Sequence, residues 1–234
     1  MKELQMIIKR LIKTITGKEI DLHPDIPMTY ILQRGFQYGL GLSRGVLRGI
    51  GLGKKGKRLF IGRGVTLLAK RKLYVGNNIR IGKYVSIDCL SKDGIQIADN
   101  VKIGDYSQII GTGSVKNMGI GLKIGKNSSF SEYSLFGSAG GITIGGDVIA
   151  GQNVRFHAEN HSYESLHIPI REQGVNRKGI SVGDNCWIGA GAVFLDGSSI
   201  GSGCIVAANA VVTKKFPDNV IIGGVPAKIL MERK

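Results

Sequence analysis

The segment HAENHSYESLH, residues 157–167, holds three of the four histidines in the chain, with two glutamates between them. Imidazole titrates near neutral pH, so a histidine here can take up a proton at the pH of a cell. His157 and His161 are four residues apart, which suits a metal only on a helix or a converging loop, and nothing else has zinc-ligand spacing. These residue types therefore predict general base chemistry and no metal site.

Around this segment, large apolar residues recur at every sixth position. Six such positions follow one another from Val182 to Val212, and a small side chain stands four residues after each of the first five. The apolar set is Val182, Ile188, Phe194, Ile200, Val206 and Val212, and the small set is Cys186, Ala192, Ser198, Cys204 and Ala210. A helix repeats at about 3.6 residues and cannot produce period six. Short strands joined by tight turns can, with three hexapeptides per coil and about 4.8 Å between coils. The pattern predicts an all-β solenoid.

The same spacing appears earlier in the chain and is interrupted at three places. It relates Val75 to Ile87, Ile97 to Ile109, Ile124 to Phe136 and Ile144 to Phe156. The register fails after residue 87, near residues 110–123, and between residues 156 and 182. The last gap predicts a loop of roughly twenty residues that leaves the coil and carries the histidines, and such loops usually carry function.

The chain resembles the hexapeptide acyltransferase family. The resemblance lies in the six-residue repeat and, most specifically, in the stretch PIREQGVNRKGISVGDNCWIGAGAVFLDGSSIGSGCIVAANAVVTKKFPDNVIIGGVPAKIL, which closes with GGVPAK (223–228). Within this family, the chain looks like the acetyl-CoA-dependent O-acetyltransferases of sugars and surface polysaccharides, over about residues 59–230. The resemblance implies a left-handed parallel β-helix over 58–234. Residues 1–57 are expected to form a separate basic, partly helical region, on the charge and apolar pattern described below. The resemblance also implies acetyl-CoA as co-substrate and a homotrimer with sites between neighbouring columns.

The resemblance assigns the residues that act on the acceptor. The family's catalytic histidine comes eight residues after the Asn of an Asn-Val step, and Asn153-Val154 stands at that distance from His161. His161 is therefore expected to be the base, with His157 as the second candidate. Apart from the resemblance, Glu159 is expected either to orient an imidazole, as carboxylates often do, or to be a solvated loop charge. The family's acceptor-binding Asn has no counterpart in SEYSLFGSAGG (131–141), so the expected acceptor contacts are His157, Glu132 and Tyr133, with Ser131 as an alternative. That departure argues against a small galactoside or maltose acceptor.

The resemblance also assigns a cofactor groove. The backbone N–H of Ala190 is expected to face the thioester oxygen, where it would stabilise an oxyanion. The remaining expected contacts to acetyl-CoA are Trp187, Gly189, Ala208, Thr213, Lys214 and Lys228. Plain surface charge is the competing explanation for the lysines, and packing on the outer wall is the competing explanation for Trp187.

Positive charge is concentrated in the first third of the chain. The net charge is +15, and residues 1–80 carry seventeen Lys and Arg against four Asp and Glu. An apolar stripe predicts a helix over residues 2–15, and four glycines spaced by four between residues 41 and 53 permit close helix packing. Region 1–57 is expected either to bind an anionic membrane or to cap the solenoid. Nucleic acid is not expected, because aromatics do not alternate with the basic residues. Three unpaired cysteines and the absence of a signal-peptide pattern predict a cytoplasmic protein.

The predicted function is acetyl transfer from acetyl-CoA to a sugar hydroxyl of a capsule, an O-antigen or a precursor, by direct attack with a histidine base. Two alternatives remain open. One is an enzyme of the same fold acting on a xenobiotic (streptogramin-type) or on an amino sugar as an N-acetyltransferase. The other is a non-catalytic hexapeptide scaffold.

Overall fold

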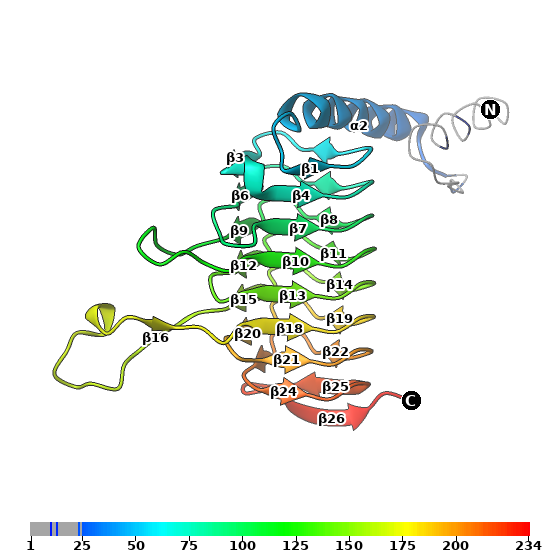
Figure 1. Ribbon diagram of the computed structural model, residues 1–234. Coiled ribbons are helices and arrows are strands. Elements are labelled where there is room, and N and C mark those ends of the chain that lie inside the picture. The colour runs from blue at the N-terminus through cyan, green and yellow to red at the C-terminus, as the bar shows by residue number, and fades with distance from the viewer. Residues whose placement is uncertain (1–9, 11–12, 14–22, 24) are drawn as a thin grey trace.

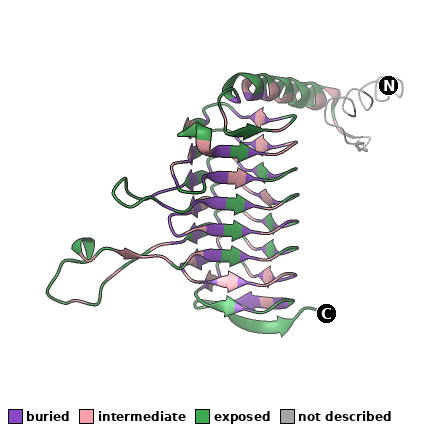
Figure 2. Cartoon of the chain, in the orientation of Figure 1, coloured by how far each residue is buried: buried purple, intermediate pink, exposed green. Residues whose placement is uncertain are grey.

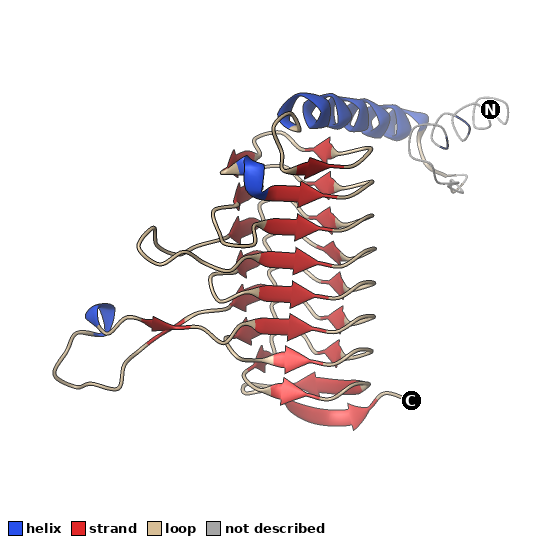
Figure 3. Ribbon diagram, in the orientation of Figure 1, coloured by secondary structure: helices blue, strands red, loops and turns tan. Residues whose placement is uncertain are grey.

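The computed structural model describes residues 10, 13, 23 and 25–234, so the helix predicted over residues 2–15 lies almost entirely outside the described residues. From residue 54 onward the chain winds as a three-sided column of short parallel strands (Figures 1 and 3). In Figure 1 the chain crosses the front face, turns behind it at the right and descends, which gives a left-handed coil. The predicted left-handed β-helix is confirmed.

Each side of the column is one sheet. Sheet A contains β1 (Lys54–Lys55), β4 (Leu73–Val75), β7 (Ile95–Ile97), β10 (Leu122–Ile124), β13 (Ile142–Ile144), β18 (Ile180–Val182), β21 (Ser199–Ile200) and β24 (Lys215–Phe216). Sheet B contains β2 (Phe60–Ile61), β5 (Arg80–Ile81), β8 (Lys102–Ile103), β11 (Ser129–Phe130), β14 (Ile149–Ala150), β19 (Trp187–Ile188), β22 (Ile205–Val206), β25 (Val220–Gly223) and β26 (Lys228–Glu232). Sheet C contains β3 (Thr66–Leu68), β6 (Ser86–Asp88), β9 (Gln108–Ile110), β12 (Leu135–Gly137), β15 (Arg155–His157), β20 (Val193–Leu195) and β23 (Val211–Val212).

The six-residue pattern fills the inside of the column (Figure 2). All eleven residues of the pattern between 182 and 212 are buried. Because successive strands pair in register, like residues stack: Phe156 lies between Phe136 and Phe194, at ring separations of 5.3 and 4.9 Å. Burial raises the pKa of Cys89 to about 12 and that of Cys186 to about 11, so both thiols are packing groups.

Helix α2 (Met28–Arg48) covers the first coil of the column. It begins after Pro27, and its glycine spacing has a packing role. Gly41 and Gly45 are buried against β2, where any Cβ would collide with the Phe60 ring or the Leu59 carbonyl. This cap closes one end of the solenoid, and β26 closes the other by pairing antiparallel with β25. No helix in the described part of the chain is long and apolar enough to cross a bilayer.

The turns between the sheets stack into edges. We call the stacked turns from sheet B to sheet C the B–C edge, and those from sheet C to sheet A the C–A edge. Both long loops leave from the C–A edge, at residues 111–121 and 158–179, where the sequence register fails. We call the second loop the arm. It carries a short antiparallel pair, β16 (Asn160–His161) and β17 (Val175–Asn176), and the chain between these two strands contains a 3₁₀ turn at Ile170–Glu172. A second 3₁₀ turn, Lys70–Lys72, lies between β3 and β4.

Candidate active site

The predicted base lies on the arm. His161 pairs with Val175 in the antiparallel ribbon, its side chain is exposed, and Figure 1 shows the arm leading away from the column. The N–H of Ser162 donates to Gly174 O at 3.1 Å, which extends the ribbon by one pair. The ribbon therefore presents His161 to solvent, away from its own column.

The root of the arm is fixed by Arg177, whose side chain is only 14% exposed. Its Nε donates to Glu159 Oε2 at 2.6 Å, and its Nη2 lies 2.6 Å from the same oxygen. Its remaining hydrogen bonds go to the 111–121 loop: Nη2 to Asn117 O at 3.0 Å, Nη1 to Met118 O at 3.1 Å and Nη1 to Asn117 Oδ1 at 3.3 Å. One guanidinium therefore ties together the two strands of the arm and a loop sixty residues earlier.

These contacts change the role expected for Glu159. Its carboxylate accepts from Arg177, and no hydrogen bond joins it to an imidazole among the described residues. The expectation that Glu159 orients an imidazole therefore finds no support in the contacts; the carboxylate instead anchors the arm that carries His161.

A second carboxylate, that of Asp196, binds the backbone where the arm rejoins the column. Asp196 is buried and accepts from the N–H of Lys178 at 2.9 Å and from that of Gly179 at 2.7 Å. Gly179 needs its positive φ of 83° to make this turn. The sequence pattern does not single out Asp196 or Arg177, because their hydrogen-bond partners are distant in the sequence and are brought near only by the fold.

The other two histidines of the segment lie apart from His161. His157 ends β15 on the outer face of sheet C, where burial, and then the charge of Arg155, lower the pKa of its imidazole. The neutral ring is therefore favoured at neutral pH. His167 is exposed near the tip of the arm. In the described part of the chain, no three His, Cys, Asp or Glu side chains come together as a metal site would need.

The expected oxyanion donor lies on the B–C edge. Gly191 N–H donates to Gln152 O at 2.8 Å, whereas the N–H of Ala190, which is exposed, has no acceptor among the described residues. Small residues continue this edge: a Cβ at Gly189 would lie 2.5 Å from Ala208 N, so glycine there is required by the stacked turns themselves. The edge thus offers an accessible backbone donor beside a surface of small side chains.

The other expected cofactor residues divide between two edges. Trp187, 54% exposed on β19, and Lys228, which pairs with Gly223, are on the sheet B side with Ala208. Thr213 and Lys214 are exposed on the C–A edge instead. A single chain therefore does not bring Thr213 and Lys214 together with Ala208.

The expected acceptor residues Glu132 and Tyr133 are on the B–C edge, two coils before Ala190. Tyr133 stacks on Tyr106, which stacks on Tyr84, each at 5.2 Å between ring centres. This ladder leaves the ring edges exposed and was missed in the sequence, because its members are 22 and 27 residues apart. His157, by contrast, is at the far end of sheet C.

One arrangement follows from these positions. In a single chain the expected base leaves from the C–A edge and the expected oxyanion donor is on the B–C edge, so all of sheet C separates them.

Comparison with known proteins tests the resemblance. Residues 179–214 match the model described as the bacterial transferase hexapeptide (six repeats). The hexapeptide-repeat resemblance is confirmed.

Relatives of this hexapeptide-repeat chain carry acetyltransferase names. Galactoside O-acetyltransferase of Escherichia coli is 34% identical over 39% of this chain and 44% of its own length. WbbJ of Escherichia coli, whose name assigns it to lipopolysaccharide biosynthesis as an O-acetyl transferase, is 32% identical over 44% of this chain and 57% of its own. The chain spans about half the length of the curated relatives it matches.

A solved structure supports the fold. AntD, an N-acyltransferase from Bacillus cereus crystallised with dTDP-4-amino-4,6-dideoxyglucose and coenzyme A, superposes with a TM-score of 0.54 at 21% identity, over 82% of this chain and 89% of its own. At that identity the likeness concerns the β-helix alone.

Proposed function

We propose that the protein is an acetyl-CoA-dependent O-acetyltransferase that acts on a sugar hydroxyl of a surface polysaccharide or its precursor. The hexapeptide repeat and the names of the sequence relatives support this reading. The observation that carries it is the unpaired Ala190 N–H on an edge of small residues, combined with an exposed histidine held on a braced arm.

The chemistry needs three groups. The imidazole of His161 takes the hydroxyl proton as the sugar oxygen attacks the thioester carbonyl. The Ala190 N–H donates to the oxyanion that develops on the carbonyl oxygen. As the intermediate collapses, the thiolate of CoA leaves, and the imidazolium returns the proton to it. No covalent acyl-enzyme is required.

We propose that the site lies between two columns of a homotrimer. His161 projects from the C–A edge of its own chain, so it can serve a neighbour whose B–C edge faces it. Thr213 and Lys214 leave from the same edge as the arm and would reach the neighbour's cofactor, whereas Trp187, Ala208 and Lys228 would contact the cofactor from the neighbour's own side. Lysine is a suitable partner for the phosphates of CoA.

The base is tested by thiol release from acetyl-CoA, with oligosaccharide fragments and nucleotide sugars as acceptors. Replacing a general base typically lowers kcat/KM by about 10²- to 10⁴-fold, and we expect this range for His161→Ala. His167→Ala, at an exposed position near the tip of the same arm, is the matched control and should stay within about tenfold of the wild type. Equal rates for the wild type and His161→Ala would exclude the proposed base.

The shared site is tested by mixing two inactive variants. Ala208→Phe should block the groove and His161→Ala should remove the base. If each site takes its base from one chain and its groove from the next, unfolding and refolding the variants together restores about a quarter of the wild-type sites by random pairing. A mixture that stays inactive, with both variants folded and trimeric, would contradict a site built from two chains.

We further propose that the protein works in the cytoplasm, at the inner face of the membrane. Helix α2 caps the column and still exposes apolar side chains, among them Leu32 (61%), Phe36 (69%) and Leu47 (68%), next to several arginines. Such a surface binds anionic lipid. Full-length protein should float with anionic vesicles, and Leu32→Glu combined with Phe36→Glu should abolish this. Leu166→Glu, at an exposed arm residue, is the control. A wild type that does not float would refute the membrane proposal, and equal flotation of all three proteins would show that the apolar surface of α2 is not the contact.

A further inference from the structure

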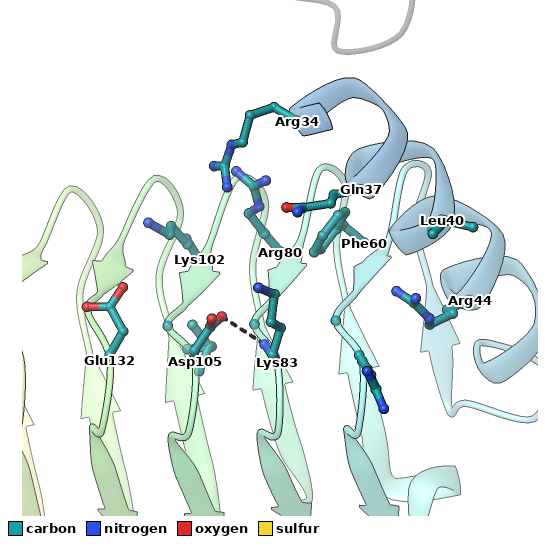
Figure 4. A pocket seen from close by; sticks show the side chains of 15 residues that line it. Arg34, Gln37, Leu40, Arg44, Phe60, Arg80, Lys83, Lys102, Asp105 and Glu132 are labelled. Carbon is teal, nitrogen blue, oxygen red and sulfur yellow. Dashed lines mark hydrogen bonds between the residues drawn. The ribbon is translucent and has the colours of Figure 1, made fainter. Parts of the chain in front are cut away.

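A cavity of about 290 Å³ lies between α2 and the first coils (Figure 4). The arm leaves the column several coils farther along (Figure 1). The floor of the cavity is the outer face of sheet B, its roof is α2, and it opens along the start of the B–C edge. Its cations are Arg34 and Arg44 from the helix and Arg63, Arg80, Lys83 and Lys102 from the coils. Asp105 and Glu132 are the carboxylates that line it.

The cavity holds six cations against two carboxylates, and the charge of Asp105 offsets part of the positive charge at Arg80. None of the six forms an ion pair within the described part of the chain. Asp105 Oδ1 accepts from the backbone N–H of Lys83 at 2.8 Å, so that carboxylate is committed to the stacked turns. Figure 4 shows Glu132 at the far end of the group.

The two central guanidinium groups face each other. Figure 4 shows Arg34, reaching down from α2, close to Arg80 on β5, with the Gln37 carboxamide beside them. Arg80 is held there by the aromatic ring of Phe60, 4.8 Å from its guanidinium carbon. Burial, and then the charge of Arg34, lower the pKa of Arg80, which is the electrostatic cost of this arrangement. Apposed, partly desolvated guanidinium groups are stabilised by an anion between them.

We propose that this cavity binds a phosphate or diphosphate group. Guanidinium groups match phosphate oxygens with paired N–H donors, and Lys83 and Lys102 add point charges along the opening. The site does not depend on the acetyl-transfer proposal, because it uses none of the residues assigned to that reaction apart from Glu132 at its rim. Its phosphate comes from either a soluble compound or a lipid headgroup.

Calorimetric titration of the full-length protein with inorganic pyrophosphate tests the site. We expect saturable binding, weakened about tenfold or more by Arg34→Gln and by Lys83→Gln, because each removes one charge-assisted contact. Lys126→Gln, an exposed lysine on the A–B side of the column, is the charge-matched control and should bind like the wild type. No binding by the wild type, or equal binding by all four proteins, would overturn the proposal. Stabilisation of the wild type against heat by pyrophosphate gives a second measurement that needs no variant.

Vesicles distinguish the two sources of phosphate. Phosphatidylcholine vesicles carrying phosphatidic acid present a phosphate monoester, and vesicles of matched charge carrying phosphatidylglycerol do not. A preference for phosphatidic acid that pyrophosphate competes away assigns a lipid source, and pyrophosphate binding without that preference assigns a soluble one. Vesicle binding that ignores pyrophosphate and both substitutions, with no calorimetric binding, would show that the helix surface acts without the cavity.

Discussion

Arg177→Ala should free the arm from the column without unfolding the column. The substitution removes four hydrogen bonds and leaves Glu159, only 25% exposed, without its counterion. Breaking a fully buried pair by removing one partner costs about 3–5 kcal/mol, and the remaining exposure of both groups reduces this to about 2–3 kcal/mol. That free energy corresponds to an increase of about 30- to 140-fold in the population of the open arm.

The assay is hydrogen–deuterium exchange of peptides from residues 158–179. These amides should exchange faster by that factor in the variant, whereas core strands such as β20 keep the wild-type rate, because local openings are independent of global unfolding. Arg171→Ala is the control, since Arg171 is on the same arm, is 85% exposed and, among the described residues, pairs only with Glu172 at 3.5 Å. Arg177→Lys keeps the charge but loses the fork of donors, so it should fall between the two.

Two results would refute this reasoning. Arm exchange in Arg177→Ala that matches Arg171→Ala would show that the ribbon holds itself without the clamp. Faster exchange throughout the column would show that Arg177 supports the whole solenoid. In the proposed enzyme, acetyl transfer should fall with the ordered fraction of the arm, because His161 is carried on it.

Three further outcomes are expected. Asp196→Ala should cost about 1–3 kcal/mol in urea denaturation, because two partly buried backbone N–H groups lose their acceptor; an unchanged midpoint would show that water replaces the carboxylate. Phe156→Ala should cost about 3–5 kcal/mol, because it opens a cavity in the aromatic stack between Phe136 and Phe194; a loss below 1 kcal/mol would mean that the coils collapse around it. His157, with its lowered pKa, binds fewer protons in the folded than in the unfolded chain below about pH 6.5, so stability falls as the pH drops through that region. His157→Gln should lose less stability between pH 7 and pH 5 than the wild type, and parallel pH curves would contradict this.

The fold could be predicted from the sequence because a solenoid repeats one local rule. Each hexapeptide places one large residue inward and one small residue at a turn, so the period alone located residues such as Val182 and Cys186 inside the column. The two long loops could be predicted for the same reason, since a loop that leaves the coil breaks the period. Handedness came from the family resemblance, because period six does not depend on it.

The arrangement of the site could not be predicted in the same way. Arg177 meets Asn117 across sixty residues, and the cavity under α2 takes its cations from a helix and several separate coils. Such contacts depend on which turns stack, and the period carries no information on how a capping helix lies across the first coil. The glycines at positions 41 and 45 did indicate close packing, but not against which strand.

The separation of His161 from Ala190 has a structural consequence. The turn at Gln152 and Asn153 is stacked on the turn that contains Ala190. From Asn153 to the root of the arm at Ala158, sheet C runs for five residues, about 16 Å at the usual rise per residue. His161 follows only three residues after that root, and the clamp of Arg177 on Glu159 directs the arm outward. To reach its own Ala190, the arm would have to turn back across sheet C and lose that clamp. In the proposed trimer, a neighbouring column would bring its B–C edge to the arm with no such rearrangement. The same side chains that hold the arm away from its own chain therefore favour assembly as a condition of the proposed activity.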